Sequence, residues 1–277
     1  MFTLHLHRSS AMGSAAERPG GRRVQAWRDQ DDAACAFGYA GDGWWAMEWP
    51  GWAIFRFGPA VGDGVEVIHR SDVAPERIED TYRRSVLPLQ LQALGCEAIH
   101  ASAVATDAGI LAFCGERRAG KSTFAFALGR RGLVQRADDA IVLDVQDGRI
   151  TAVPLPFAPR LRPASAAFFA AEDDVPLTAG AGPEPLRAVF MLSQDACASP
   201  CTLEPLAGTA AFRALLAHAH IFEPQNPAAK RRLVSHYLEV AGAVPVINVR
   251  YAPRLADLPQ VLDRLLVEAG VALPVTQ

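Results

Sequence analysis

The segment from Gly115 to Ser122 reads Gly-Glu-Arg-Arg-Ala-Gly-Lys-Ser, and it constrains what this chain can fold into more than any other segment. It matches the pattern G-x-x-x-x-G-K-[ST], whose glycines let backbone N–H groups close around phosphates. An apolar run from Gly109 to Cys114 precedes it, and helix-forming residues from Ser122 to Arg131 follow it. A buried strand, a tight loop and a helix are the context that phosphate binding requires. The sequence therefore predicts a site for a nucleoside triphosphate.

Two side chains of this segment have specific expected roles. Lys121 would reach the β- and γ-phosphates of ATP, and the Ser122 hydroxyl would bind Mg²⁺. Lys230 is the one other lysine in the sequence, so chance is a weak explanation for a lysine at the motif position. A glycine-rich turn without a ligand is the less favoured alternative. The residues predicted to contact the nucleotide are Gly115, Glu116, Arg117, Arg118, Ala119, Gly120, Lys121, Ser122 and Thr123.

Composition excludes several classes of protein. The chain has 277 residues, 50% of them apolar, and a net charge of −3, so it can bury a large core and is not expected to bind nucleic acid. No apolar stretch reaches the ~18 residues of a membrane span, and Met1 to His7 lack the features of an export signal. The five cysteines form no disulfide-like framework, and Cys197 and Cys201 fit free thiols better than a metal site. We therefore expect a cytoplasmic protein without a membrane partner.

The first quarter of the chain has the texture of a small β-sheet. After a turn-rich stretch at 8–23 that predicts a loop, short β-type runs extend from Val24 to about Arg70 and predict an antiparallel sheet. All five tryptophans lie in the first fifth of the chain, and they fit either an aromatic core, which we favour, or a groove for a peptide. We therefore divide the chain into a β-rich N-terminal region, residues 1–72, as a candidate acceptor-binding module, and a phosphate-loop domain, residues 73–277.

A strand before the glycine-rich segment carries the first candidate catalytic residue. Glu97 to Val104 alternates as a strand does, with His100 and Ser102 on one face. A turn at Asp107 to Gly109 leads into the next strand, so the two strands are expected to form a hairpin. Such a hairpin would carry His100 and Ser102 close to the phosphates.

A strand after the glycine-rich segment carries the acidic candidates. Leu133 to Leu143 reads as a strand with Asp138 and Asp139 inside an apolar frame. Buried carboxylates need a cation or hydrogen bonds, and Mg²⁺ beside a triphosphate supplies a cation. One aspartate can accept the proton of an attacking hydroxyl, the other can hold the metal, and His100 can orient the base. A pair of acids at a turn or strand end, without catalytic function, is the alternative.

The remaining elements follow from periodicity. Helical spacing predicts a helix from Ser71 to Gly95 with a kink at Pro88, and a proline-rich stretch at 154–185 predicts edge strands and loops that can act as a lid. Further strands are expected at 186–192 and 244–251, and further helices at 207–221, 227–240 and 258–268.

Taken together, these residues resemble the HPr kinase/phosphorylase family. The resemblance covers about residues 97–144 and rests on His100-Ala-Ser-Ala-Val104, on the loop Gly115–Ser122, and on Arg131-Gly132 followed by Ala137-Asp138-Asp139. It implies an α/β fold with a mixed sheet and a phosphate-loop core similar to phosphoenolpyruvate carboxykinase. It also implies transfer of a phosphoryl group from ATP, with Mg²⁺, to a serine hydroxyl of a protein. By position, it implies that Asp138 is the general base, that Asp139 assists with metal or proton, and that His100 supports the base.

The sequence departs from the family pattern at two places. Pro159-Arg-Leu-Arg-Pro163 stands where the bacterial sugar-regulation enzymes have Glu-Ile-Arg-Gly with a metal-binding glutamate, and Arg117-Arg118 replaces their usual Ser-Gly. The first departure weighs against phosphorylase action and against HPr as the acceptor. The β-rich front end is more similar to the shorter HPr-kinase-related proteins of lasso-peptide clusters, which phosphorylate a peptide on a serine near its C-terminus. The resemblance therefore implies a peptide or protein acceptor that bears a serine.

Other charged residues and two rival functions stay open. Arg160 and Arg162 can contact the transferring phosphoryl group, or they can be ordinary surface charge. His218 and His220 fit core or surface histidines better than a metal site. A nucleotide-binding regulatory protein without transfer activity and a small-molecule kinase are the alternatives to a peptide kinase. The sequence also leaves open whether the protein is a homo-oligomer.

Overall fold

The computed structural model describes residues 6–9, 19–28, 34–62, 64–153, 155, 161–170 and 182–272. The chain forms two compact units. Unit 1 comprises Met1–Gly95 and Ile221–Arg232, and unit 2 comprises Cys96–His220 and Leu233–Gln277. The domain boundary expected after residue 72 differs from this division, because the helical segment that follows residue 72 belongs with unit 1. Within the parts of the chain that the structure describes, no helix combines the length and apolar character needed to cross a membrane.

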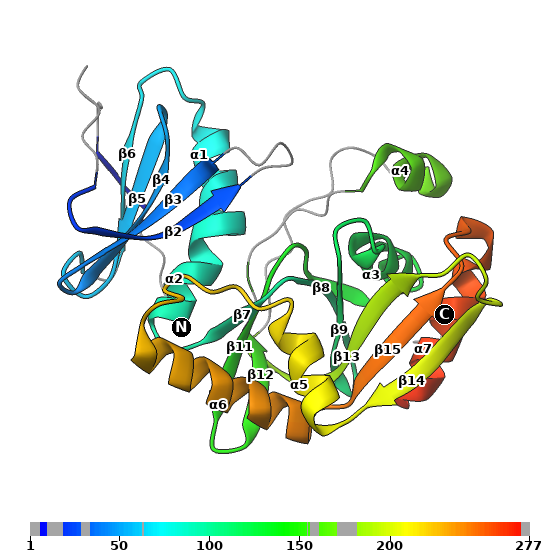
Figure 1. Ribbon diagram of the computed structural model, residues 1–277. Coiled ribbons are helices and arrows are strands. Elements are labelled where there is room, and N and C mark those ends of the chain that lie inside the picture. The colour runs from blue at the N-terminus through cyan, green and yellow to red at the C-terminus, as the bar shows by residue number, and fades with distance from the viewer. Residues whose placement is uncertain are drawn as a thin grey trace. The chain divides into compact units, whose positions relative to one another are not determined.

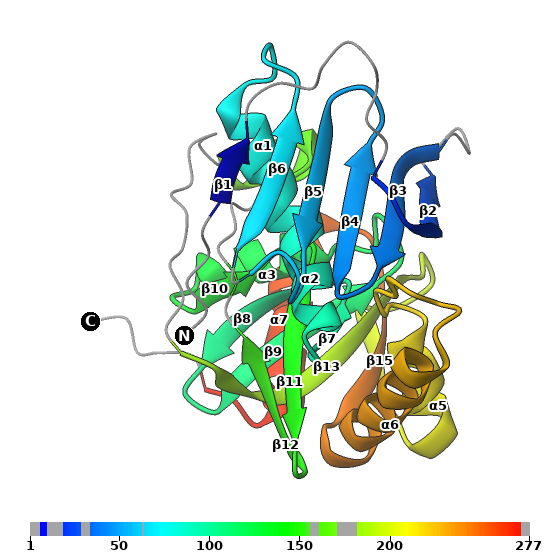
Figure 2. The same cartoon turned by 90° about the vertical axis from the view of Figure 1, so that its left-hand side faces the viewer.

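Unit 1 is built on a six-stranded sheet with the order β1-β6-β5-β4-β3-β2 (Figure 2). Strands β2 to β6 are antiparallel to their neighbours, which confirms the predicted antiparallel sheet, and β1 adds to it in parallel beside β6. Most of the predicted loop at 8–23 lies outside the described residues. The strands of unit 1 are β1 (Leu6–Ser9), β2 (Arg22–Arg28), β3 (Ala34–Gly41), β4 (Trp44–Trp49), β5 (Ala53–Phe57) and β6 (Val65–His69).

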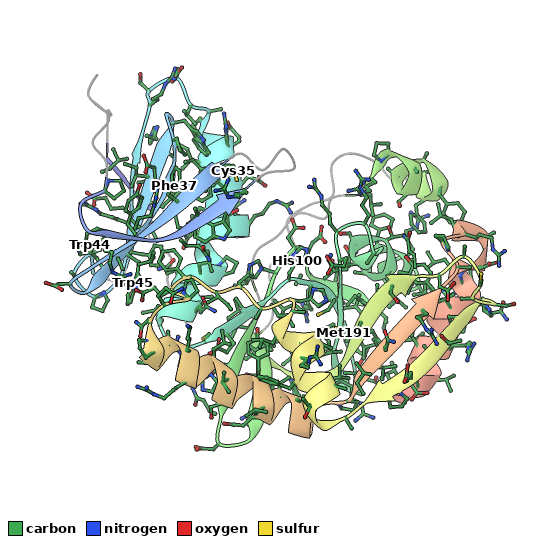
Figure 3. The ribbon with its side chains drawn as sticks, viewed as in Figure 1. Cys35, Phe37, Trp44, Trp45, His100 and Met191 are labelled. Carbon is green, nitrogen blue, oxygen red and sulfur yellow. The ribbon has the colours of Figure 1, made fainter. Side chains whose placement is uncertain are left out.

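The tryptophans of unit 1 border its core rather than fill it. The fully buried positions of β5 and β6 are Phe55, Phe57 and Val67, each at 0% exposure. All five tryptophans are only half-buried. Trp44 and Trp45 are neighbours on β4 (Figure 3). The favoured expectation of an aromatic core is therefore confirmed in part, because Phe55 and Phe57 fill the core while Trp45 and Trp49 pack against them at its border.

One helical segment follows the sheet and continues through a π-helical turn. It consists of α1 (Pro75–Thr81), a π-helix (Tyr82–Val86) and α2 (Leu87–Ala93). Pro88 lacks an N–H and cannot bond the carbonyl four residues earlier, so a proline normally kinks a helix. Here the N–H of Leu87 donates to Tyr82 O, which lengthens the turn just before the proline. The π-turn is therefore the form that the predicted kink takes.

Unit 2 is a curled, mixed nine-stranded sheet (Figure 1). Along the sheet the strands follow the order β10-β8-β9-β13-β12-β11-β7, with β15 beside β13 and β14 at its outer edge. Strands β9, β13 and β15 are parallel to one another, and the other pairs are antiparallel. These strands are β7 (Glu97–Ile99), β8 (Ala101–Thr106), β9 (Gly109–Gly115), β10 (Val134–Ala137), β11 (Ile141–Gln146), β12 (Arg149–Val153), β13 (Glu184–Gln194), β14 (Cys201–Leu206) and β15 (Val246–Tyr251).

The helices of unit 2 flank this sheet. Helices α3 and α7 pack on one face, where their apolar side chains share a core with Phe113, Phe190 and Val249. Phe113 stacks on Phe190 with ring centroids 5.8 Å apart, and both side chains are fully buried. The helices are α3 (Lys121–Gly129), α4 (Pro163–Phe169), α5 (Gly208–Leu216), α6 (Pro227–Ala243), which begins in the second segment of unit 1, a 3₁₀ turn (Leu255–Asp257) and α7 (Leu258–Ala269).

Two expected strands are each broken into two. The stretch 97–104 is interrupted at His100, because β7 pairs with β11 whereas β8 pairs with β9 and β10. The stretch 133–143 is likewise interrupted at 138–140, because its first part, β10, pairs with β8 and its second part, β11, pairs with β7. The predictions of single strands there are therefore wrong, while the predicted hairpin, now β8 and β9, is confirmed. The candidate catalytic residues stand at these two breaks.

Candidate active site

The glycine-rich loop, residues 115–120, leaves the C-terminal end of β9 and enters α3 at Lys121. Two glycines fit it to its surroundings. Gly115 has φ +147°, and a Cβ there would lie 2.5 Å from the backbone oxygen of Leu192. Gly120 has φ +91°, and a Cβ there would lie 2.4 Å from Tyr251 Oη. The loop is therefore closely held by the ends of β13 and β15, and only glycine fits at either position.

Lys121 turns back onto this loop. Its Nζ donates to Gly115 O at 2.9 Å and to Glu116 O at 3.1 Å, and the side chain is buried. Burial lowers the pKa of Lys121, and the charges of Asp138 and Asp139 act in the opposite direction. The ammonium thus lies at the loop where the outer phosphates of a nucleotide would meet it.

The Asp138 side chain is hydrogen-bonded both to α3 and to strand β8. Its Oδ1 accepts hydrogen bonds from Ser102 Oγ at 2.8 Å and from Ser122 Oγ at 2.7 Å. The carboxylate is 7% exposed, so these hydroxyls supply part of the stabilisation that a buried charge needs. The Ser122 hydroxyl donates its hydrogen bond to Asp138. This bond uses the hydroxyl hydrogen and not the lone pairs of the oxygen, so the oxygen can bind a cation.

Asp139 and His100 meet at the two strand breaks. Asp139 has φ +73°, an uncommon conformation for a residue other than glycine, and its backbone oxygen lies 2.6 Å from His100 Nδ1. A carbonyl oxygen only accepts hydrogen bonds, so Nδ1 carries the proton. Burial lowers the pKa of His100, and the charge of Lys121 lowers it further. His100 is therefore neutral at physiological pH, and its Nε2 bears a lone pair.

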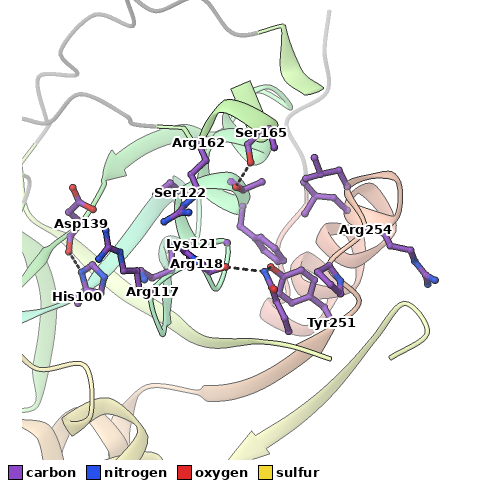
Figure 4. Close-up of a pocket in the computed structure, with 18 residues that line it drawn as sticks. His100, Arg117, Arg118, Lys121, Ser122, Asp139, Arg162, Ser165, Tyr251 and Arg254 are labelled. Atoms are coloured by element: carbon purple, nitrogen blue, oxygen red, sulfur yellow. Dashed lines mark hydrogen bonds between the residues drawn. The ribbon is translucent and has the colours of Figure 1, made fainter. Parts of the chain in front are cut away.

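These residues open onto one cavity of about 560 Å³ within unit 2. His100 and Asp139 lie at one end, Tyr251 and Arg254 at the other, and Lys121 and Ser122 between them (Figure 4). Three further arginines make the cavity a setting for an anion, and they are Arg117, Arg118 and Arg162. Arg160, the other arginine predicted to contact phosphate, lies outside the described residues.

The structure brings nearly all the predicted residues together. Arg117, Arg118, Gly120, Lys121, Ser122 and Thr123 line the cavity with His100 and Asp139. Gly115, Glu116 and Ala119 form the backbone of the loop behind them, and Asp138 is buried between Ser102 and Ser122. The position of each residue therefore agrees with a single site, whereas its role in a reaction stays a prediction.

His218 and His220, expected from the sequence only as core or surface histidines, lie beside His100. The N–H of His100 donates to His218 O at 2.8 Å, and the rings of His100 and His220 are edge to face with centroids 6.0 Å apart. Burial lowers the pKa of His218 and lowers the pKa of His220 to about 4. The N–H of His220 donates to Ala98 O at 2.8 Å, so this segment runs beside β7. The sequence predicts a helix over 207–221, whereas α5 ends at Leu216, and no local pattern indicates that the following residues reach His100.

The donor set suits Mg²⁺ rather than a metal held by protein alone. Among the described residues, no group of three or more histidines, cysteines or carboxylates gathers to hold a metal. Magnesium is commonly bound by one or two carboxylates or hydroxyls together with the oxygens of substrate phosphates. The Ser122 hydroxyl and the adjacent carboxylates of Asp138 and Asp139 are hard oxygen donors of this kind.

Comparison with known proteins gives little further information. A scan against protein-family models found no match, and a search of curated proteins found no similar sequence. Among solved structures, the chain is similar to the Hpr(Ser) kinase/phosphatase from Coxiella burnetii, with 14% sequence identity and a TM-score of 0.35, over 62% of this chain and 88% of that chain. A likeness of this size carries no weight for the reaction, so the chemistry has to come from the residues of the site.

Proposed function

We propose that this protein is a kinase that transfers the γ-phosphoryl group of ATP to a serine hydroxyl of a peptide or protein. The observation that carries the proposal is the shared cavity, onto which a buried lysine and a serine from the start of α3, an aspartate and a neutral histidine open from separate parts of the chain. Phosphoryl transfer depends mainly on positioning and on neutralising charge, and these groups supply both.

Each residue has a chemical part in this proposal. Lys121 and the backbone of the glycine-rich loop bind the phosphates, and the arginines of the cavity add positive charge. Ser122 and a carboxylate of the aspartate pair would hold Mg²⁺, which when bound neutralises phosphate charge and aligns the transferred group. His100 orients the pair through its bond to the backbone of Asp139.

Two observations support a division of roles between the aspartates that reverses the expectation from sequence. Asp138 Oδ1 accepts from Ser122, so Asp138 stands beside the predicted metal ligand. Asp139 lines the cavity, where the hydroxyl of an acceptor would arrive. We therefore assign proton acceptance to Asp139 and the orientation of Ser122 to Asp138. The opposite assignment, with Asp138 as the base, is decided by the experiment below.

The proposal that the acceptor is a peptide rests on the motif resemblance. That resemblance implies a serine-bearing peptide of the lasso type, made in a biosynthetic cluster, and the arginine-lined cavity is compatible with an anionic C-terminal segment of such a peptide. A small-molecule alcohol is the rival acceptor.

The test is phosphoryl transfer from labelled ATP to candidate peptides by wild type, Asp138→Asn and Asp139→Asn. We expect Asp139→Asn to bind ATP and to lose transfer by about 10²- to 10⁴-fold, the usual contribution of a general base. Asp138→Asn should mainly weaken the binding of ATP with Mg²⁺. The matched control is Asp144→Asn, since Asp144 lies on β11, accepts from Gln146 and does not line the cavity.

Three outcomes contradict parts of the proposal. Loss of transfer with intact binding in Asp138→Asn, and not in Asp139→Asn, would restore Asp138 as the base. Labelled product from small alcohols but from no peptide would change the acceptor. Tight ATP binding without any labelled product would favour the regulatory protein over the kinase.

A further inference from the structure

Two side chains from neighbouring strands grip the carbonyl groups of the glycine-rich loop. Tyr251, at the end of β15, donates from Oη to Ala119 O at 3.0 Å, and Gln194, at the end of β13, donates from Nε2 to Arg118 O at 2.9 Å. Gln194 and Tyr251 are opposite each other in the parallel ladder, and Gln194 Nε2 also lies 3.4 Å from Tyr251 Oη. The phenol thus accepts from one partner while it donates to the other.

These bonds fix the direction of two peptide groups. In a planar trans peptide the N–H points away from the C=O, so a bond that holds one carbonyl also sets the following N–H. Gln194 holds Arg118 O, and the N–H of Ala119 donates to Glu116 O at 3.0 Å, which closes the turn of the loop. Tyr251 holds Ala119 O, so the N–H of Gly120 points away from the phenol.

The tyrosine is rigid enough to set this geometry. It is 7% exposed, and its ring packs edge to face on Phe124 of α3 with centroids 4.9 Å apart. Its Oη also lies 2.4 Å from the place of a Cβ at Gly120, so it bounds the loop on that side. Burial raises the pKa of Tyr251, so the hydroxyl stays protonated and keeps its role as a donor.

We infer that Tyr251 and Gln194 are positioning residues that hold the loop in the shape in which its N–H groups, chiefly that of Gly120, bind the outer phosphates of a nucleotide. The inference rests on the proposed function, because it requires that the loop bind phosphates. Gln194 of β13 and Tyr251 of β15 would act on the nucleotide through their hydrogen bonds to the loop backbone and not through contact with the reacting groups.

The experiment measures the dissociation constants of ATP with Mg²⁺ and of inorganic triphosphate for Tyr251→Phe and Gln194→Met. Triphosphate reports the phosphate part of the site without the nucleoside. A net hydrogen bond to an oriented group is worth enough to weaken binding by about three- to tenfold. We expect Tyr251→Phe to weaken both ligands by such a factor and Gln194→Met to weaken both by about threefold. We expect kcat to change less than KM.

Tyr237→Phe is the matched control. Tyr237 is fully buried in unit 2, and its hydroxyl donates to the backbone oxygen of Ala98 at 3.0 Å. Its substitution removes the same kind of bond from α6 rather than from the loop. We expect it to lower the melting temperature and to leave both dissociation constants unchanged. If Tyr251→Phe lowers the melting temperature alone, Tyr251 is merely structural and the inference is overturned.

The two proposals fail in different ways. If the wild type binds both ligands and each variant binds them equally well, the positioning role falls and the proposed function stands. If the wild type binds neither ligand, both fall. If the wild type binds but transfers no phosphoryl group, the kinase proposal falls, and the affinities of the variants still decide the role of Tyr251 and Gln194.

Discussion

Replacement of His220 by asparagine should flatten the acid dependence of the stability of unit 2. Burial, together with a smaller contribution from the nearby His100, lowers the pKa of His220 from 6.5 to about 4, and the charge of Asp139 acts in the opposite direction. Because the folded-state pKa is below the unfolded value, the unfolded chain binds a proton first as the pH falls. The stability from the neutral ring is therefore complete above pH 6.5 and is lost progressively between pH 6.5 and pH 4.

The size of this loss follows from the shift. A tenfold change in an equilibrium constant corresponds to about 1.4 kcal/mol, so the titration of His220 should remove about 2 kcal/mol by pH 5 and about 3 kcal/mol by pH 4. Domains are stable by only about 5–15 kcal/mol, so this is a large part of the whole. His100 and His218 also have pKa values lowered by burial, but they are present in both wild type and variant and cancel in the comparison.

The assay is urea unfolding of wild type and His220→Asn at several pH values between 8 and 4. All five tryptophans lie in unit 1, so tryptophan fluorescence follows that unit, and far-UV circular dichroism is needed to follow unit 2. The difference between the two proteins at pH 8 measures the structural cost of the substitution alone. The wild type should then lose about 2 kcal/mol more than the variant by pH 5. Two parallel curves would show that the burial of His220 does not control its protonation.

Two further substitutions test the loop and the core. Arg118→Gly should change the free energy of unfolding by less than about 1 kcal/mol, because relief of the conformation at φ +74° offsets the greater freedom of glycine in the unfolded chain; loss of its guanidinium should weaken ATP binding several-fold in a titration. Phe190→Ala should cost about 3–5 kcal/mol in urea unfolding, because Phe190 is fully buried and stacks on Phe113; a cost below about 1 kcal/mol would mean that the core does not depend on this ring.

Local features of the site could be predicted from the sequence because they depend on neighbouring residues. The strand β9, the glycine-rich loop and the start of α3 are consecutive, and β8 joins β9 through a short turn, so pattern and turn chemistry suffice. Tyr251 could not be predicted as a contact of the loop. It reaches Ala119 only because β15 pairs in parallel with β13, and that pairing joins residues far apart in the chain.

The division into two units could not be predicted from the sequence either. Residues 221–232 belong to unit 1, where Phe222 N donates to Gln92 at 3.0 Å and Trp45 Nε1 donates to Glu223 at 3.0 Å. These bonds link segments separated by more than 100 residues, and no local sequence pattern predicts such contacts. The boundary expected after residue 72 follows a change in texture from strands to a helix, and such a change does not reveal what the helix packs against.

The two broken strands explain why the candidate residues converge. The pairs Ile99–Ile141 and Ala103–Ala137 belong to the same antiparallel register, so β7 with β8 and β10 with β11 trace one ladder with a gap between these pairs. Within the gap, Ser102 Oγ bonds the Asp138 carboxylate and His100 Nδ1 bonds Asp139 O. Side chains thus make hydrogen bonds where a regular ladder would use backbone groups. In an uninterrupted ladder the two backbones would be aligned here, and successive side chains would point to opposite faces of the sheet. Because the ladder is interrupted, Asp138 reaches Ser122 while the next residue, Asp139, lines the cavity.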